Sequence, residues 1–300
     1  MTIRRLAIVG LGLIGSSLAR AAALHLPELA VTGWDADADV RDTARTIGLC
    51  TVADTPADAV AGADLVMLCI PVGAMEATAE ALAPHLPPDA IVSDVGGSKA
   101  SVIAALRRHL PDAVIVPGHP VAGTEHSGPE AGFATLFHGR WCILTPEPDA
   151  PDAAVAAVTE FWQALGAEVE RMTPAHHDLV LAVTSHVPHL IAYSIVGTAS
   201  DLEQVTESEV IKFSAGGFRD FTRIAASDPT MWRDVFLNNR AAVLEVLQRL
   251  QEDVAVLQRA IRWGDGDQLF DLFTRTRAIR RSIIDQGQDD ARPDFGRAHD

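Results

Sequence analysis

Residues 6–15 read Leu-Ala-Ile-Val-Gly-Leu-Gly-Leu-Ile-Gly, an apolar run that leads into three glycines at positions 10, 12 and 15. A Gly-x-Gly-x-x-Gly pattern between a strand and a helix is typical of dinucleotide-binding turns. Gly10 permits the tight turn, Gly12 lets the backbone approach a pyrophosphate, and Gly15 lets the helix pack closely against the strand. The unpaired N–H groups at the start of the helix then face the phosphates. The sequence therefore predicts a nucleotide cofactor.

The surroundings of the glycines support this prediction, since a bare glycine pattern can also mark an ordinary strand-to-helix bend. Ile3 to Val9 has the composition of a strand, Ser16 to Leu24 is rich in Ala and Leu, and Ala30 to Trp34 is a second strand that Asp35 follows. An acid at that point accepts hydrogen bonds from the ribose hydroxyls and repels a 2′-phosphate, so NAD is favoured over NADP. The residues predicted to contact the cofactor are Gly10, Gly12, Leu13, Ile14, Gly15, Asp35 and Pro71.

Composition limits the possible partners. The chain has 300 residues, 48% of them apolar, and a formal net charge of −16. That length is enough for two domains with cores of their own. The negative charge argues against nucleic acid and anionic membranes as partners, so an anionic substrate would need local arginines.

Three cysteines, Cys50, Cys69 and Cys142, lack the spacing of metal ligands, and we predict no metal site. The N-terminus enters a strand directly, and no apolar stretch approaches the length of about 18 residues that a membrane span needs. We therefore expect a cytoplasmic protein with reduced cysteines.

Residues 1–172 alternate strands with Ala-rich helices, which indicates an α/β Rossmann-type dinucleotide-binding domain built on a parallel sheet. The expected strands are Arg5 to Val9, Ala30 to Trp34, Leu65 to Cys69, Ala90 to Asp94, Ala113 to Pro117, Trp141 to Thr145 and Glu168 to Arg171. The expected helices include Ser16 to Leu24, Val72 to Ala83, Lys99 to His109 and Ala153 to Leu165. Because ligands bind beyond the carboxyl ends of such strands, chemistry is expected at Ile70-Pro71, Asp94 to Lys99 and Gly118 to Gly128.

Residues 173–285 form the second predicted domain, which is all-α. Thr173-Pro174 resembles a helix N-cap followed by proline at the first helical position. Between Asn239 and Ile261, apolar residues recur in steps of three and four at Leu247, Leu250, Val254, Leu257 and Ile261. Such a stripe packs against another helix, either within the chain or in a second copy. Residues 286–300 are polar and charged, and we expect them to be disordered.

Three further motifs carry a resemblance to a known family. They are the run from Gly118 to Gly128 (Gly-His-Pro-Val-Ala-Gly-Thr-Glu-His-Ser-Gly), Ser185-His186-Val187-Pro188-His189, and the run from Gly216 to Ala225. With the glycine loop, and in this order, they resemble the prephenate and arogenate dehydrogenase family of tyrosine biosynthesis over residues 3 to about 283. The resemblance implies a homodimer, formed by a helical dimerisation domain, that oxidises prephenate or arogenate with NAD(P) while carbon dioxide leaves and the ring becomes aromatic.

His119 resembles the catalytic histidine of that family. A neutral imidazole, with an unperturbed pKa near 6.5, can accept a proton from the substrate hydroxyl at cellular pH. The alternative is a loop histidine whose nitrogens bond to neighbouring carbonyl groups.

The resemblance also implies substrate contacts at His189, Arg223, Thr124 and Glu125. Arg223 matches the arginine that binds a substrate carboxylate, for which its planar fork is suited. His186 and His189 are three residues apart and could share a metal, but no acid or cysteine nearby completes a ligand set. We assign His186 to local support, and we interpret His176-His177-Asp178 as solvated or helix-capping.

One loop departs from the family pattern. Relatives often carry Asp-x-Gly-Ser-x-Lys, with that serine bonded to the catalytic histidine, whereas this chain has Gly97 at the serine's position and Ser98 after it. Our hypothesis is that Ser98 takes over the contact and is part of the catalytic set. Alternatively, a water makes the contact or the histidine is less firmly oriented, and Ser98 caps the helix that begins near Lys99.

Other functions remain open at this stage. An acid in the substrate pocket would favour the amine of arogenate, and a neutral or basic pocket would favour the keto acid prephenate. Another β-hydroxyacid dehydrogenase or an imine reductase would carry a catalytic lysine in the helical domain. A silent nucleotide sensor would bind the cofactor without turnover, since fold alone does not establish activity.

Overall fold

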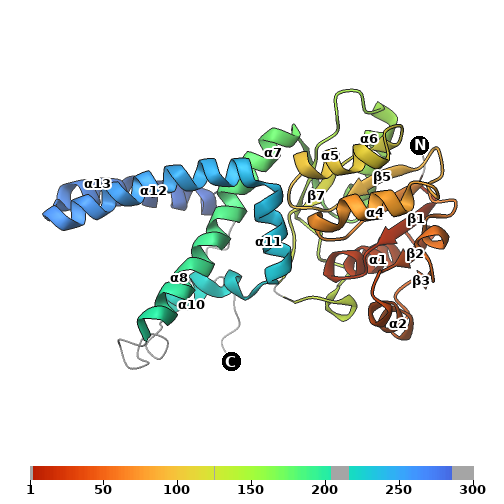
Figure 1. Ribbon diagram of the computed structural model, residues 1–300, viewed down its shortest axis with the longest axis horizontal. Coiled ribbons are helices and arrows are strands. Elements are labelled where there is room, and N and C mark those ends of the chain that lie inside the picture. The colour runs from red at the N-terminus through yellow and green to blue at the C-terminus, as the bar shows by residue number, and fades with distance from the viewer. Residues whose placement is uncertain (1–2, 125, 204–215, 286–300) are drawn as a thin grey trace. The chain divides into compact units, whose positions relative to one another are not determined.

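The computed structural model describes residues 3–124, 126–203 and 216–285 (Figure 1). Its main sheet has six parallel strands in the order β3-β2-β1-β4-β5-β6. They are β1 (Arg5–Val9), β2 (Ala30–Trp34), β3 (Thr51–Val52), β4 (Leu65–Leu68), β5 (Ile91–Asp94) and β6 (Val114–Ile115). The strand order reverses between β1 and β4, which is where sheets of this kind bind ligands at their carboxyl edge.

Helices cover both faces of this sheet. One core cluster joins Leu6 and Ile8 of β1 to residues of α1 (Leu13–His25), α2 (Ala38–Thr46) and α6 (Asp152–Ala164). The other joins Ala7 and Val9 to residues of α3 (Pro56–Val60), α4 (Met75–Leu82) and α5 (Ala100–His109). Because successive strand residues point to opposite faces, a strand covered on both sides must be apolar throughout. This explains the unbroken apolar run before the glycines.

A second, smaller sheet corrects the prediction of a single parallel sheet. It contains β7 (Gly118–Pro120), β8 (Trp141–Leu144) and β9 (Glu168–Arg171), and the β7–β8 pair is antiparallel. The chain leaves the main sheet after β6, where Pro117 has no N–H to donate to the ladder. The strand predicted over Ala113 to Pro117 is therefore only two residues long.

The remaining boundaries agree closely with the predictions, with short elements added. The predicted helix from Val72 begins as a 3₁₀ turn, η1 (Val72–Ala74), before α4. β3, α2 and α3 were not predicted, because they are short or mostly polar.

The second half of the described chain is helical. It contains α7 (Pro174–Leu181), η3 (Ala182–His186), α8 (Val187–Glu203), α10 (Gly216–Thr222), η4 (Arg223–Ala226), α11 (Pro229–Asn238), α12 (Arg240–Trp263) and α13 (Gly266–Asp285). Thr173 caps α7 as predicted, since its side chain accepts a hydrogen bond from the His176 N–H. The η3 segment is a π-helix that precedes Pro188 and widens the helix by one residue. Such bulges are common at functional sites.

One expectation about apolar segments is wrong. Among the described residues, the helical run Pro174–Leu202 is long and apolar enough to cross a membrane by length and composition alone. A single such helix is weak grounds for a membrane span, because core helices of other proteins meet the same criterion. Buried polar residues on this run, including His177 and Asp178, bond to the sheet-containing part of the chain.

The chain divides into two compact units, Met1–Leu244 and Glu245–Asp300. The helices α7 to α11 thus pack in one unit with both sheets. The boundary between the compact units follows residue 244, whereas the predicted functional domains meet at 172/173. The reason is that α7 bonds to α5, and α11 packs on η1.

The described part of the second unit exposes much apolar surface on α12 and α13. Val254 and Ile261 of the predicted stripe are 53% and 68% exposed, and Phe270 of α13 is 70% exposed. Leu247, Leu250 and Leu257 are half-buried. The stripe is therefore only partly covered within one chain. The predicted disordered tail, residues 286–300, lies outside the described residues.

Candidate active site

The glycine loop has the geometry that a pyrophosphate site requires. Gly10 has φ +98°, and a Cβ there would lie 2.3 Å from the Cys69 carbonyl oxygen. A Cβ on Gly15 would lie 1.9 Å from the Gly10 oxygen, whereas one on Gly12 would meet no described atom within 4 Å. Gly12 is the N-cap of α1 and supplies no side chain to its first N–H groups. These residues fit a dinucleotide, because the loop leaves both space and backbone donors for phosphates.

Asp35 lies directly after β2, beside this loop. Its Oδ2 accepts a hydrogen bond of 2.8 Å from the Leu11 N–H, and its Oδ1 accepts one of 3.0 Å from the Asp37 N–H. The carboxylate is thus held beside the glycines. Arg41, which the sequence analysis missed, donates from Nη1 to the Asp35 carbonyl at 2.7 Å.

The other predicted cofactor residues lie at the same edge of the sheet. Leu13 and Ile14 form the half-buried first turn of α1. Pro71 is exposed after β4, where it is the N-cap of η1. All of them therefore follow β1 or β4, the two strands between which the strand order reverses.

A buried ion pair holds the backbone before His119. Lys99 and Asp94 are both fully buried and in direct contact, and Lys99 Nζ also donates to the Gly118 carbonyl at 2.6 Å. The Gly118 N–H in turn lies 3.3 Å from Asp94 Oδ1. His119 follows on β7, opposite Ile143 of β8. The end of β5, the start of α5 and the start of β7 are thus fixed together.

His119 contacts the first turns of α7. Its Nδ1 lies 2.9 Å from His177 Nε2, and His177 Nδ1 lies 2.9 Å from Asp178 Oδ1. Asp178 also accepts hydrogen bonds from the Lys99 and Ala100 N–H groups at 2.7 and 3.0 Å, so it caps α5. The interpretation of His177 as solvated is wrong, because its side chain is fully buried. Its hydrogen-bond partner His119 is 58 residues away in sequence, and no local sequence pattern reveals such a contact.

The electrostatic surroundings keep His119 neutral. Burial lowers the pKa of His119 well below its usual value, and the neighbouring His177, Lys99 and His186 lower it further. Burial also lowers the pKa of His177, although the hydrogen bond to Asp178 opposes this. A neutral imidazole can accept a proton, which is what the predicted role requires.

Ser98 does not make the predicted contact. Its hydroxyl is buried and pairs with Ser101 Oγ at 3.2 Å, and no hydrogen bond among the described residues joins it to His119. The side chain points toward the first turn of α5 instead. Gly97 is closer, since a Cβ there would lie 3.9 Å from both Cε1 and Nε2 of His119.

His189 lies on α8 with its ring fixed on both sides. Its Nδ1 donates to the Ser185 carbonyl at 2.8 Å, and the ring stacks on Trp232 of α11 with a centroid separation of 3.6 Å. Burial lowers the pKa of His189, the Ser185 carbonyl raises it, and Arg223 lowers it. Arg223, the first residue of η4, is therefore within electrostatic range of His189. Trp232 was not predicted, because a single tryptophan in a helix carries no motif.

His186 continues this row of basic groups. Burial lowers the pKa of His186 to about 4, and His177 and His189 contribute to the shift. Its Nδ1 accepts a hydrogen bond of 3.0 Å from Asn239 Nδ2, consistent with the predicted role in local support. His119, His186, His189 and Arg223 thus form a basic row, in which each group influences the next. Because the three imidazoles are held neutral, the guanidinium of Arg223 supplies the positive charge of this row, and it favours an anionic ligand.

No contact among the described residues joins Thr124 to the row of His119, His186, His189 and Arg223, and Glu125 cannot be compared with it. Thr124 is exposed, and its hydroxyl accepts a hydrogen bond from the His126 N–H at 3.2 Å. Glu125 lies outside the described residues.

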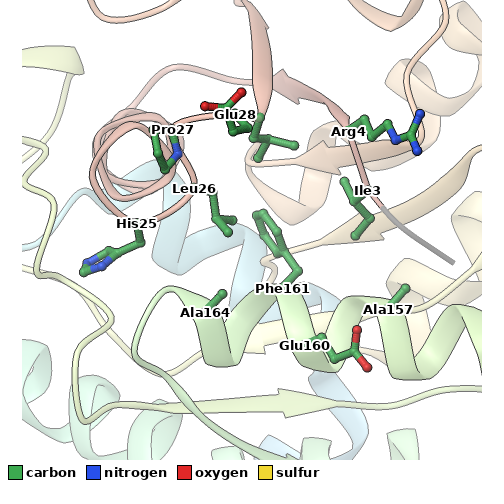
Figure 2. A pocket seen from close by; sticks show the side chains of 11 residues that line it. Ile3, Arg4, His25, Leu26, Pro27, Glu28, Ala157, Glu160, Phe161 and Ala164 are labelled. Atoms are coloured by element: carbon green, nitrogen blue, oxygen red, sulfur yellow. The ribbon is translucent and has the colours of Figure 1, made fainter.

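Neither metal ligands nor the groove shown in Figure 2 define this site. The described residues contain no group of three His, Cys, Asp or Glu side chains placed to hold a metal. A groove of about 660 Å³ lies near the amino end of β1, where Arg4, Leu26 and Phe161 line it (Figure 2). It is at the opposite edge of the sheet from the glycine loop, and it contains none of the predicted site residues.

Comparison with known proteins identifies the family. Residues 18–171 match the model for the nucleotide-binding domain of prephenate dehydrogenase, and residues 173–275 match the model for its dimerization domain. The chain is 45% identical to a cyclohexadienyl dehydrogenase of Zymomonas mobilis over 93% of this chain and 96% of that one.

Solved structures agree with this result. A prephenate dehydrogenase from Aquifex aeolicus, crystallised with hydroxyphenyl propionate and NAD+, superimposes with a TM-score of 0.88 at 32% identity, covering 94% of this chain and 99% of that one. An arogenate dehydrogenase from Synechocystis gives a TM-score of 0.78 at 26% identity, covering 93% and 99%. With a dinucleotide loop, a half-buried neutral histidine and matches along nearly its whole length, the chain belongs to the prephenate dehydrogenase family of NAD-dependent oxidoreductases.

Proposed function

We propose that this enzyme catalyses the NAD-dependent oxidative decarboxylation of prephenate to 4-hydroxyphenylpyruvate in tyrosine biosynthesis. The observation that carries the proposal is the position of His119. It is neutral, fixed by buried polar groups, and lies in the row of His186, His189 and Arg223. This arrangement provides a base and an anion-binding surface together.

The chemistry divides between cofactor and protein. The glycine loop at Gly10, Gly12 and Gly15 would hold NAD, which would supply the acceptor for the hydride on the ring carbon that carries the hydroxyl. His119 accepts the hydroxyl proton, the bond to the ring carboxylate breaks to release carbon dioxide, and its electron pair completes the aromatic ring. Because aromatisation drives the reaction, the protein mainly orients the substrate and stabilises charge.

Arg223 and His189 are proposed to bind the substrate. The guanidinium of Arg223 offers paired donors to a carboxylate, and His189 presents Nε2 because its Nδ1 donates to Ser185. Prephenate carries two carboxylates, so a basic row is suited to it. Thr124 and Glu125 remain proposed contacts at the pocket entrance, on the resemblance alone.

The basic row also bears on substrate choice. Arogenate differs from prephenate by an ammonium group in place of a ketone, and the guanidinium of Arg223 disfavours that extra positive charge. We propose prephenate as the preferred substrate and arogenate as a secondary one. Arogenate is the competing candidate, because the Synechocystis relative is an arogenate dehydrogenase.

We further propose a cytoplasmic homodimer. The exposed apolar residues of α12 and α13 need a partner, and the matching family model describes a dimerization domain. Its three cysteines are free, as in a reducing compartment. We propose functional domains of 1–172 and 173–285, the first for NAD and the second for dimerisation.

The test is NADH formation by the purified protein with prephenate and arogenate supplied separately, with identification of the aromatic product. We expect hydroxyphenylpyruvate from prephenate at the higher kcat/KM. Reversed preference would make the enzyme an arogenate dehydrogenase. If NAD binds but neither substrate is turned over, a different hydroxyacid substrate or a sensor would replace this proposal.

A further inference from the structure

A buried pair on α7 takes no part in the mechanism above. His177 has no exposed surface and Asp178 is 6% exposed, yet neither is predicted to touch substrate or cofactor. Burial of two titratable groups is costly unless every polar atom is paired. Their hydrogen bonds, followed from Asp178 outward, assign the protons of both imidazoles.

The assignment begins at Asp178, which is an ionised acceptor. Both of its oxygens face backbone donors, because Oδ1 lies 2.7 Å from the Lys99 N–H and Oδ2 lies 3.0 Å from the Ala100 N–H. Burial alone would raise the pKa of Asp178, but hydrogen bonds from His177, Ala100 and Lys99 lower it below its usual value. A carboxylate in this state can only accept, so His177 Nδ1 must carry a hydrogen toward it.

The second step fixes His119. With its one proton on Nδ1, neutral His177 presents a lone pair at Nε2, and this atom lies 2.9 Å from His119 Nδ1. Two lone pairs cannot face each other at that distance, so His119 Nδ1 carries a hydrogen and donates it. The opposite arrangement would leave the unprotonated Nδ1 of His177 against the Asp178 carboxylate.

We propose that His177 and Asp178 are positioning residues that hold His119 in the tautomer whose Nε2 is unprotonated and free to accept the substrate proton. Neither residue touches the reacting atoms. The proposal rests on the proposed function in one respect, which is that His119 is the base. The tautomer itself follows from the contacts and holds whatever the substrate.

This arrangement also acts on the product of proton transfer. After Nε2 accepts the hydroxyl proton, the Nδ1 hydrogen of the His119 imidazolium still points at the His177 acceptor. A hydrogen bond to the charged form favours it. Without His177, the ring can rotate or exchange tautomers, and its imidazolium loses a partner.

The charged and titratable groups around His119 come from α7, η3, β5 and the start of α5. His177 and Asp178 lie on α7, His186 lies in η3, and the Lys99–Asp94 pair joins the N-cap of α5 to the last residue of β5. Lys99 and the protonated forms of His177 and His186 oppose a charge on His119. Burial keeps His177 neutral, and in that form its Nε2 lone pair, with Asp178 behind it, accepts the Nδ1 hydrogen of the imidazolium and favours it.

The direct test is the ring nitrogen spectrum of the histidines, which reports each tautomer without reference to activity. In protein labelled with ¹⁵N-histidine, long-range ¹H–¹⁵N correlation near neutral pH is expected to show His119 protonated at Nδ1 and bare at Nε2. The His119 signals are identified by their loss in His119→Asn. A His119 protonated at Nε2 would overturn the proposal.

Two substitutions test the role of the acceptor. Gln at position 177 can place an amide oxygen near the Nε2 position, whereas Leu fills similar space with no acceptor. We expect His177→Leu to lower kcat about 100-fold with a small change in KM, within the range that a general base contributes. The acid limb of kcat/KM should move to lower pH, since the imidazolium loses a partner. His177→Gln should recover most of the rate and the wild-type tautomer.

The exposed neighbour His176 supplies a matched control, since His176→Leu lies on the same helix turn and should leave the rate and the pH profile unchanged. Equal losses in His177→Leu and His177→Gln, with the His119 tautomer unaltered in both, would contradict a positioning role. If the tautomer is as proposed but His119→Asn keeps full turnover, the positioning geometry stands and the proposed base is wrong.

Discussion

Asp35 shows how one side chain can select the cofactor. Its carboxylate is held by the Leu11 and Asp37 N–H groups beside the glycine loop, where a 2′-phosphate would meet its negative charge. Arg41 lies next to it, bonded to the carbonyl of Asp35. Removing the charge therefore leaves a cation close to the place where a 2′-phosphate would bind.

We predict that Asp35→Asn lowers the ratio of kcat/KM for NAD over NADP by at least about tenfold, which corresponds to about 1.4 kcal/mol. Steady-state kinetics with both cofactors measures this ratio. The control is Asp42→Asn, which removes an exposed charge from α2. If the NAD/NADP ratio of kcat/KM in Asp35→Asn stays at the wild-type value, Asp35 does not distinguish the ribose hydroxyl from a 2′-phosphate.

His186 couples stability to pH. Its pKa in the folded protein is about 4, below the unperturbed value near 6.5 of an unfolded chain. Between these values the unfolded chain binds the extra proton, so the free energy of unfolding falls as pH drops through this window and is unaffected above it.

The variant His186→Asn retains an acceptor for Asn239. Between pH 7 and pH 5, we predict that its free energy of unfolding falls by about 2 kcal/mol less than that of the wild type. Urea unfolding at both pH values gives the comparison. His119, His177 and His189 shift in the same direction and add to the wild-type loss, so the variant should still weaken at pH 5. Identical losses in the two proteins would contradict the assigned pKa.

At the scale of elements, the Lys99–Asp94 pair joins β5, α5 and β7. Lys99 bonds to Asp94 and to the Gly118 carbonyl, and all three groups are buried. Removing one member of a buried pair leaves an uncompensated charge, which costs more than the pair itself contributes.

Lys99→Met should therefore destabilise the fold by about 3–5 kcal/mol, as measured by urea unfolding. The double variant Lys99→Met with Asp94→Asn should be less destabilised than Lys99→Met alone, because it buries no unpaired charge. If the double variant is less stable than Lys99→Met, the loss of stability comes from packing and not from an unpaired charge.

Sequence could predict the elements whose signals are local. The apolar run of β1, the three glycines and Asp35 all lie within about 30 residues, and each has a steric or electrostatic reason to be where it is. Thr173-Pro174 likewise marked the start of α7, because cap residues act within one turn.

Contacts between residues that are far apart in the sequence could not be predicted from local patterns. The turn of the chain into a second sheet at Pro117 depends on which strands pair, and the burial of His177 depends on a residue 58 positions away. Ser98 illustrates the same limit, since the motif placed it near His119 but the first turn of α5 directs its hydroxyl to Ser101.

At the scale of the whole molecule, α12 and α13 expose apolar residues that no other described part of the chain covers. Ile261, Trp263 and Phe270 are each at least 68% exposed. Large apolar side chains exposed to this extent on two neighbouring elements of the chain are typical of a subunit interface.

We predict that Ile261→Asp shifts the protein from dimer to monomer in sedimentation velocity, because a charge in an apolar interface is left desolvated and unpaired. Leu24→Asp provides the control, as Leu24 is 59% exposed on α1 and outside the proposed interface. Persistence of the dimer in Ile261→Asp would place the interface elsewhere.

The central claim is that His119 is the base for the oxidation of prephenate. The measurement that tests it most directly is NADH formation from NAD and prephenate by wild-type enzyme and His119→Asn, together with substrate binding by calorimetry. We predict turnover by the wild type and a loss of kcat of at least about 100-fold in the variant, with binding nearly unchanged. A variant that turns over prephenate at the wild-type rate would contradict the account.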